Sequence, residues 1–139
     1  MEQFPVGCEV IEICPGQLPA KLHFFSAPND YKPPSSSESM VFFCTDEKYI
    51  YTSFFADFGP LDLGQTHSFC KDMEKLMAEA AAANKGIAYY TRTEPNRQAR
   101  SNSAVFVCAY LVLAMDFPPE KAYSAFLGMP YVLMLIWLS

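Results

Sequence analysis

IAYYT at residues 87–91, followed after a polar stretch by AVFVCAYLVLAM at residues 104–115, decides the fold of this sequence. The first segment is apolar on both sides of its alternation, which is typical of a central parallel strand. The second follows potential capping residues at Ser101, Asn102 and Ser103 and has no polar face, so it predicts a helix that lies inside a layered domain. A strand that leads through a loop into a buried helix is the basic unit of an α/β sheet.

The flanking sequence adds further strands and helices to this unit. Three apolar runs rich in β-branched or aromatic residues have the length of strands. These runs are residues 10–13, 21–25 and 40–45. A helix capped by Asp62 has apolar residues at three-four spacing between positions 66 and 80. Pro119 suits the first turn of a last helix, which Gly128 can end. We therefore expect a single α/β domain over residues 1–139.

The charge balance and composition argue against some classes of function. Lys and Arg number 10 against 15 Asp and Glu, for a net charge of −5, so the chain lacks the positive field that holds nucleic acid. Charged residues make up only 18% of the chain, below the roughly 25% of an average soluble domain. Some apolar surface is therefore expected to meet a partner. The longest apolar runs fall short of the roughly 20 residues that span a bilayer, which predicts no membrane span.

Five cysteines are scattered along the chain without a C-x-x-C pair or a nearby histidine pair. This spacing predicts neither a zinc site nor a disulfide framework, and we expect no metal and no cofactor. Reduced cysteines, together with an amino-terminus that lacks the pattern of a secretory signal, favour an intracellular location, either nuclear or cytoplasmic.

The turn between the predicted strand at 87–91 and the helix after it is a potential anion site, because the first amides of a helix point into it. In cysteine-dependent phosphatases a thiolate at this strand end attacks phosphorus, and an arginine six positions later holds the phosphate oxygens. None of the five cysteines here has an arginine six positions later, and Thr91 stands where the nucleophile belongs. Glu94 adds a negative charge to the turn, and Pro95 removes an amide hydrogen from it. The pattern predicts a phosphatase-like frame in which Thr91 is a vestigial catalytic position.

Four motifs in this order resemble one known module. They are FFADFGPLDL at 54–63, NRQARSNSA at 96–104, CAYLV at 108–112 and PPEKAYSAFL at 118–127. Together they resemble the amino-terminal domain of the cell-division-cycle-fourteen dual-specificity protein phosphatases, the mitotic-exit type, and the similarity covers roughly residues 9–127. The resemblance implies an α/β fold with a dual-specificity-phosphatase-like central sheet flanked by helices.

The resemblance also implies a division of labour, because the family carries two phosphatase-like domains in tandem. The carboxyl-terminal domain holds the cysteine and the arginine, whereas the amino-terminal domain is catalytically silent and helps to form the substrate groove. This chain resembles the silent half. It is therefore expected to be a substrate-binding and scaffold module, with a catalytic phosphatase domain in cis and phosphoprotein substrates as its partners.

The charged residues of the domain receive expected roles in the same way. Asp57 occupies the place of a general acid, as a vestigial position, although it also suits the turn into the next helix. Arg92, Arg97 and Arg100 are candidates for anion or interdomain contacts, with a solvated loop as the alternative. Glu120 either joins an acidic substrate groove or favours the positive end of its helix.

Two segments depart from the predicted core. Residues 27–39, APNDYKPPSSSES, are polar and proline-rich and are expected to form a flexible loop. Residues 129–139 are apolar where the family continues with a polar stretch, which indicates either a truncated gene product or a segment that docks elsewhere. Two alternatives to the silent module stay open. One is an active phosphatase with an unrecognised nucleophile, such as Thr91 or a cysteine, and the other is a free-standing pseudophosphatase regulator.

Overall fold

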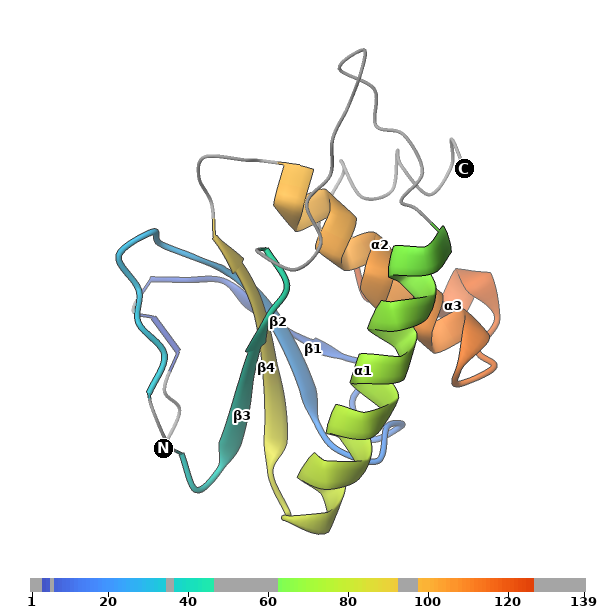
Figure 1. Ribbon diagram of the computed structural model, residues 1–139, viewed down its shortest axis with the longest axis horizontal. Coiled ribbons are helices and arrows are strands. Elements are labelled where there is room, and N and C mark those ends of the chain that lie inside the picture. The colour runs from blue at the N-terminus through green and yellow to red at the C-terminus, as the bar shows by residue number, and fades with distance from the viewer. Residues whose placement is uncertain (1–3, 6, 35–36, 47–62, 93–97, 127–139) are drawn as a thin grey trace.

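A four-stranded sheet with helices packed against it forms the described part of the chain (Figure 1). The computed structural model describes residues 4–5, 7–34, 37–46, 63–92 and 98–126. The strands are β1 (Val10–Ile13), β2 (Leu22–Ala27), β3 (Met40–Cys44) and β4 (Gly86–Arg92). The helices are α1 (Leu63–Ala82), α2 (Gln98–Leu113) and α3 (Pro119–Ser124). The predicted α/β fold class is confirmed.

β4 is a central strand, as its two-sided apolar pattern predicted. The strand order is β1-β2-β4-β3, and β4 pairs in parallel with both β2 and β3. β1 instead pairs antiparallel with β2, which makes the sheet mixed. The reason is the connection at 14–21, which is shorter than the dozen or so residues that a parallel crossover needs.

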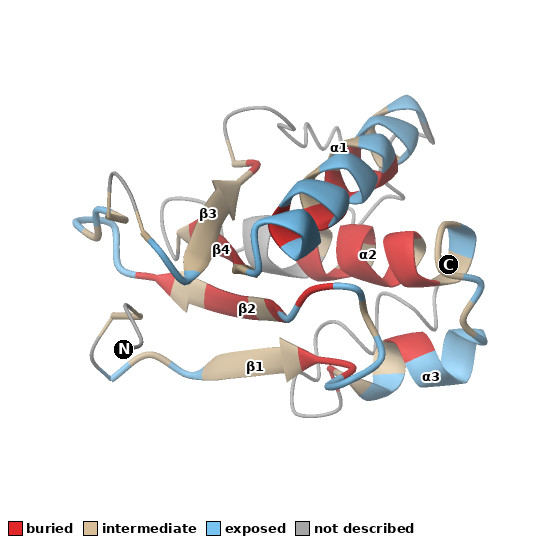
Figure 2. Cartoon of the chain, turned by 90° about the horizontal axis from the view of Figure 1, so that it is seen from below, coloured by how far each residue is buried: buried red, intermediate tan, exposed pale blue. Residues whose placement is uncertain are grey.

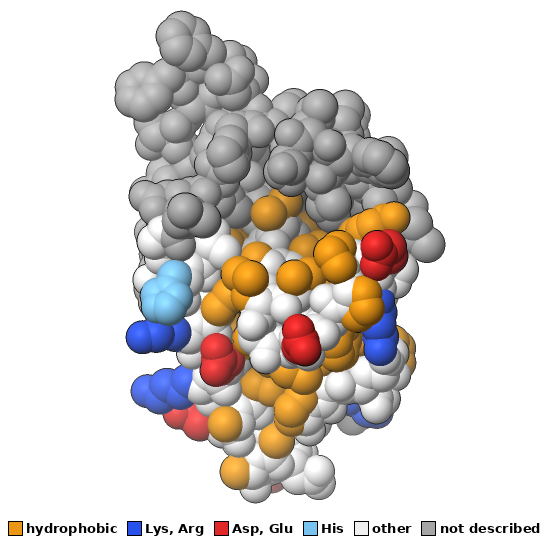
Figure 3. Space-filling model, turned by 90° about the vertical axis from the view of Figure 1, so that its right-hand side faces the viewer, with side chains coloured by type: hydrophobic (Ala, Val, Ile, Leu, Met, Phe, Trp, Pro, Cys, Tyr) orange, Lys and Arg blue, Asp and Glu red, His pale blue; other side chains and the backbone are white. Residues whose placement is uncertain are grey.

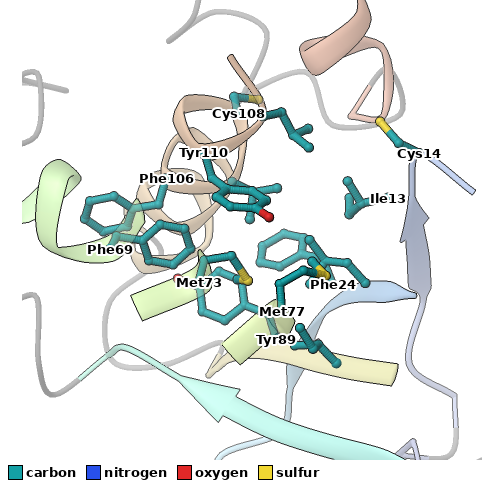
Figure 4. Close-up of a cluster of buried hydrophobic side chains, with 14 of the residues drawn as sticks. Ile13, Cys14, Phe24, Phe69, Met73, Met77, Tyr89, Phe106, Cys108 and Tyr110 are labelled. Atoms are coloured by element: carbon teal, nitrogen blue, oxygen red, sulfur yellow. The ribbon is translucent and has the colours of Figure 1, made fainter. Parts of the chain in front are cut away.

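The main core lies between the sheet and the helices, which cover one face (Figures 1 and 2). The predicted three-four spacing of α1 is confirmed, because Phe69, Met73 and Met77 are buried against this core. Figure 4 shows Phe69 beside Phe106 of α2, and the two rings stack at a centroid distance of 5.0 Å. Aromatic packing of this kind holds α1 and α2 together above the sheet.

The opposite face of the sheet carries a smaller apolar cluster. Phe25 of β2 and Tyr90 of β4 stack there, with ring centroids 5.7 Å apart. Phe4 and Tyr31 pack on this pair from segments outside the sheet, with ring centroids 5.3 Å and 6.0 Å from Phe25. This face is therefore covered by chain segments rather than by the described helices.

Several element boundaries differ from the predictions. α2 begins at Gln98, earlier than the predicted caps, because Gln, Ala and Arg are good helix formers and extend the first turn. β2 runs on to Ala27, the first residue of the predicted loop, because Ala27 still pairs with Arg92 in the ladder. α3 ends at Ser124, before the predicted stop at Gly128, which lies outside the described residues.

The burial of α2 is less complete than its all-round apolar pattern predicted. Val107, Tyr110 and Leu111 are buried against the sheet and the neighbouring helices. Leu113, in contrast, is 70% exposed, although it ends an apolar run. The helix is thus covered on its inner sides and partly open on its outer side.

Candidate functional site

Thr91 lies at the carboxyl end of β4, the position expected for a vestigial nucleophile. Its side chain is fully buried, and within the described residues its Oγ1 has no hydrogen-bond partner. Alternation along the strand places Thr91 on the same face as Tyr89, toward the helices. A hydroxyl nucleophile needs a base to take its proton. The described residues place no such base in hydrogen-bond contact with Thr91.

The guanidinium group of Arg92 forms hydrogen bonds with the backbone of the segment that follows β2. Its Nη1 donates hydrogen bonds to the carbonyl oxygens of Tyr31 at 2.7 Å and of Pro28 and Asn29 at 3.2 Å. The guanidinium carbon also lies 5.6 Å from the centre of the Tyr90 ring. The start of the predicted flexible loop is therefore tied to β4. A contact between Arg92 and an external anion stays a prediction.

Asp46 joins the end of β3 to the end of β4. Its Oδ2 accepts a hydrogen bond of 2.8 Å from the backbone N–H of Arg92, whereas its Oδ1 is buried and has no partner among the described residues. This contact of Asp46 was not predicted from the sequence. The signal for it is weak, because it is one acidic residue after an apolar strand and its partner is far away in sequence.

A buried hydroxyl network stands next to Thr91. The hydroxyl groups of Thr45 and Tyr89 share a hydrogen bond of 2.6 Å. Burial raises the pKa of Tyr89 above its usual range, and hydrogen bonds with Ser103 of α2 and with Thr45 partly offset that rise. These three residues tie β3, β4 and α2 together at the turn. A tyrosine in a central strand needs such a partner when buried, and this was the available signal.

Four of the five cysteines lack the lowered pKa of an activated nucleophile. None of the five forms a disulfide. Burial raises the pKa of Cys44 to about 11 and that of Cys108 to about 12, and it also raises the pKa values of Cys14 and Cys70. A reactive cysteine needs a lowered pKa, because the thiolate is the nucleophile. At pH 8 only about one in a thousand Cys44 side chains is a thiolate.

Glu120 lies beyond the carboxyl-terminal end of α2, whereas β4 precedes the amino-terminal end of that helix. It is an exposed residue in the first turn of α3, where its charge suits the positive end of the helix. Arg92 precedes the amino-terminal end of α2, whereas Glu120 follows the carboxyl-terminal end of the same helix (Figure 1). The structure therefore does not bring these two charges together.

The other predicted site residues are only partly described. Arg100 belongs to the first turn of α2, and its side chain lies outside the described residues. Asp57 and Arg97 also lie outside them. Their assigned roles stay predictions. In the described ranges no group of three His, Cys, Asp or Glu side chains could hold a metal ion, and no helix there is long and apolar enough to cross a membrane.

Replacing Thr91 by valine is expected to raise the free energy of unfolding by about 1 kcal/mol, because a methyl group of the same shape replaces a buried hydroxyl without a partner. Urea denaturation measures the change. The matched control is Thr45→Val, which breaks the hydrogen bond to Tyr89 and is expected to destabilise by about 1–2 kcal/mol. Destabilisation by Thr91→Val would show that its hydroxyl is bonded after all.

Comparisons with known proteins place this chain in a family of phosphatases. A family model described as "Dual specificity protein phosphatase, N-terminal half" matches residues 17–134. The relatives include dual specificity protein phosphatase CDC14AB of Danio rerio, 35% identical over 95 residues, which are 68% of this chain and 15% of that protein. CDC14A of Homo sapiens is 34% identical over 95 residues, 68% of this chain and 16% of that protein.

The similarity extends to fungal proteins. Tyrosine-protein phosphatase CDC14 of Saccharomyces cerevisiae is 29% identical over 92 residues, which are 66% of this chain and 16% of that protein. The matched segment thus spans about one sixth of the length of these relatives. The family model, in contrast, covers most of the present chain. The chain therefore belongs to the family of amino-terminal halves of CDC14-type dual-specificity protein phosphatases.

Proposed function

We propose that this chain is catalytically silent and serves as a substrate-binding and scaffold module for a catalytic phosphatase domain. The observation that carries the proposal is Thr91, which stands buried at the strand end where a phosphatase places its thiolate. Its hydroxyl has no base among the described residues and is closed off from solvent. A threonine thus stands at the end of β4 where a thiolate phosphatase carries its nucleophile, which supports a catalytically silent chain.

The other groups that phosphate-ester cleavage would need, a thiolate and an arginine, also support a catalytically silent chain. A thiolate phosphatase needs an arginine six positions after its cysteine, and no cysteine of this sequence has one. Burial holds the pKa of Cys44 and Cys108 far above neutral pH, so these thiols stay protonated. Arg92, the last residue of β4, already binds backbone carbonyls within the domain. Among the described residues these properties favour the silent module over an active phosphatase.

The scaffold role rests on composition and on the family match. Only 18% of the residues are charged, so part of the surface is apolar and is suited to a partner domain. The matched family is named as one half of a dual-specificity phosphatase, which supports a catalytic half as that partner. The substrates of the assembled enzyme would then be phosphoproteins. Glu120 is exposed and free to face a basic segment of such a substrate.

A direct assay separates these functions. The purified chain is expected to release phosphate from a phosphotyrosine mimic no faster than buffer does. In the same assay the catalytic half of a CDC14 relative serves as the active control, and the chain is expected to bind that half in a pull-down with purified proteins. Vanadate-sensitive turnover by the chain alone, lost on changing one cysteine, would establish the active phosphatase instead. Inhibition of an intact relative without binding to its catalytic half would favour the free-standing regulator.

A further inference from the structure

The outward side of α2 carries an apolar strip that we call the outer stripe. It consists of Val105, Ala109, Val112 and Leu113. At about 100° per residue these four positions fall within roughly 100° of the helix circumference. The first three are partly exposed, and Leu113 is 70% exposed. Among the described residues Leu113 is the one large hydrophobic side chain that is exposed.

The outer stripe lies between two other helices. Figure 2 shows α2 flanked by α1 and α3, with the sheet on its inner side. Figure 3 shows the side of the molecule opposite the sheet, where hydrophobic side chains gather between charged ones. Single exposed apolar residues are ordinary, but a whole apolar helix face is expected to be covered. Residues 101–113 contain no charged side chain that could keep this face in water.

An apolar segment follows soon after α3 in the sequence, and α3 is a neighbour of α2. α3 packs beside α2, with the Cys108 thiol 3.9 Å from the carbonyl oxygen of Ala122. Phe126, at the end of the described chain, is fully buried, and its ring lies 5.8 Å from that of Phe24. The segment 129–138, MPYVLMLIWL, begins three residues later and contains no charged residue. We propose that this segment docks on the outer stripe of α2.

Length and attachment fit this occupant. From Val105 to Leu113 the stripe is about 12 Å long at the helix rise of 1.5 Å per residue. Residues 131–138 reach about 26 Å when extended, which is longer than the stripe. Covalent attachment near α3 gives the segment an effective concentration in the millimolar range. At lower protein concentrations it therefore binds in preference to a second copy of the chain.

Trp137 is the single tryptophan of the chain and reports directly on this docking. In the full chain its fluorescence is expected to be shielded from acrylamide. Leu113→Asp places a charge in the stripe and is expected to raise the undocked fraction about tenfold, with a matching increase in quenching. Ala78→Asp, at an exposed position of α1, is the matched control and is expected to leave the quenching unchanged.

Two further measurements keep the test decisive. Leu113→Ala, which adds no charge, is expected to increase quenching to a smaller extent while a cooperative thermal transition shows that the fold persists. Shielding that disappears on dilution, together with dissociation of a dimer in analytical ultracentrifugation, would assign the stripe to a second copy and overturn the proposal. Quenching in the full chain equal to that of a free tryptophan amide, or unaffected by Leu113→Asp, would also overturn it.

Discussion

Replacing Phe69 by alanine is expected to lower the free energy of unfolding by about 3–5 kcal/mol, a large part of the roughly 5–15 kcal/mol that stabilises a domain. Phe69 is fully buried where α1, α2 and the sheet meet. Its ring centroid lies 5.0 Å from that of Phe106, 5.4 Å from that of Tyr89 and 6.2 Å from that of Phe43. Truncation removes these contacts and leaves a cavity, which urea denaturation measures as a loss of stability.

The control for this variant comes from the same helix. Lys75 is exposed on α1, and Lys75→Ala is expected to change the free energy of unfolding by less than about 0.5 kcal/mol. Phe69→Leu keeps most of the volume and is expected to cost less than the alanine variant. A loss below about 1 kcal/mol for Phe69→Ala would contradict the packing of α1 described above.

Replacing Arg92 by alanine is expected to lower the free energy of unfolding by about 2 kcal/mol, because three backbone carbonyls then lose the charged donor that they share. The effect is expected to be strongest locally, at the segment 28–31. Hydrogen exchange at the Tyr31 amide, which donates to the Pro28 carbonyl at 3.0 Å, reports on that segment. Urea denaturation gives the global loss.

Two further variants test whether the planar shape of the Arg92 guanidinium group is needed to hold the 28–31 segment. Arg92→Lys is expected to recover less than half of the lost stability, because an ammonium group lacks the planar fork of a guanidinium. Lys32→Ala removes an exposed cation of the same connection and is expected to leave exchange at Tyr31 unchanged. Unchanged exchange at Tyr31 in Arg92→Ala would mean that the segment is held by its aromatic contacts alone.

Much of the fold was predictable because its signals are local. The three-four spacing of Phe69, Met73 and Met77 predicted α1 and its buried side, and the structure confirms both. The apolar pattern at 87–91 predicted a central strand, because alternate side chains point to opposite faces and both faces must then be covered. The start of α2 was misplaced, since weak caps compete with residues of good helix propensity.

The candidate site was predictable only in part. Thr91 was assigned correctly to the strand end, and the missing cysteine–arginine pair is visible in the sequence. The contacts of Arg92 were missed because its acceptors lie 61 to 64 residues earlier in the chain. The Thr45–Tyr89 hydrogen bond spans 44 residues and was missed for the same reason.

The sequence by itself determined which segments form strands and helices, which sides of them are apolar, and that no cysteine has an arginine six positions later. These properties depend on side chains that lie close to one another along the sequence. Only the tertiary structure decided that Arg92 binds the 28–31 segment, that burial keeps the Cys44 and Cys108 thiols protonated, and that the other described residues leave the outer stripe of α2 partly exposed. Each of these depends on strand register and helix placement, which bring together groups that lie far apart along the chain.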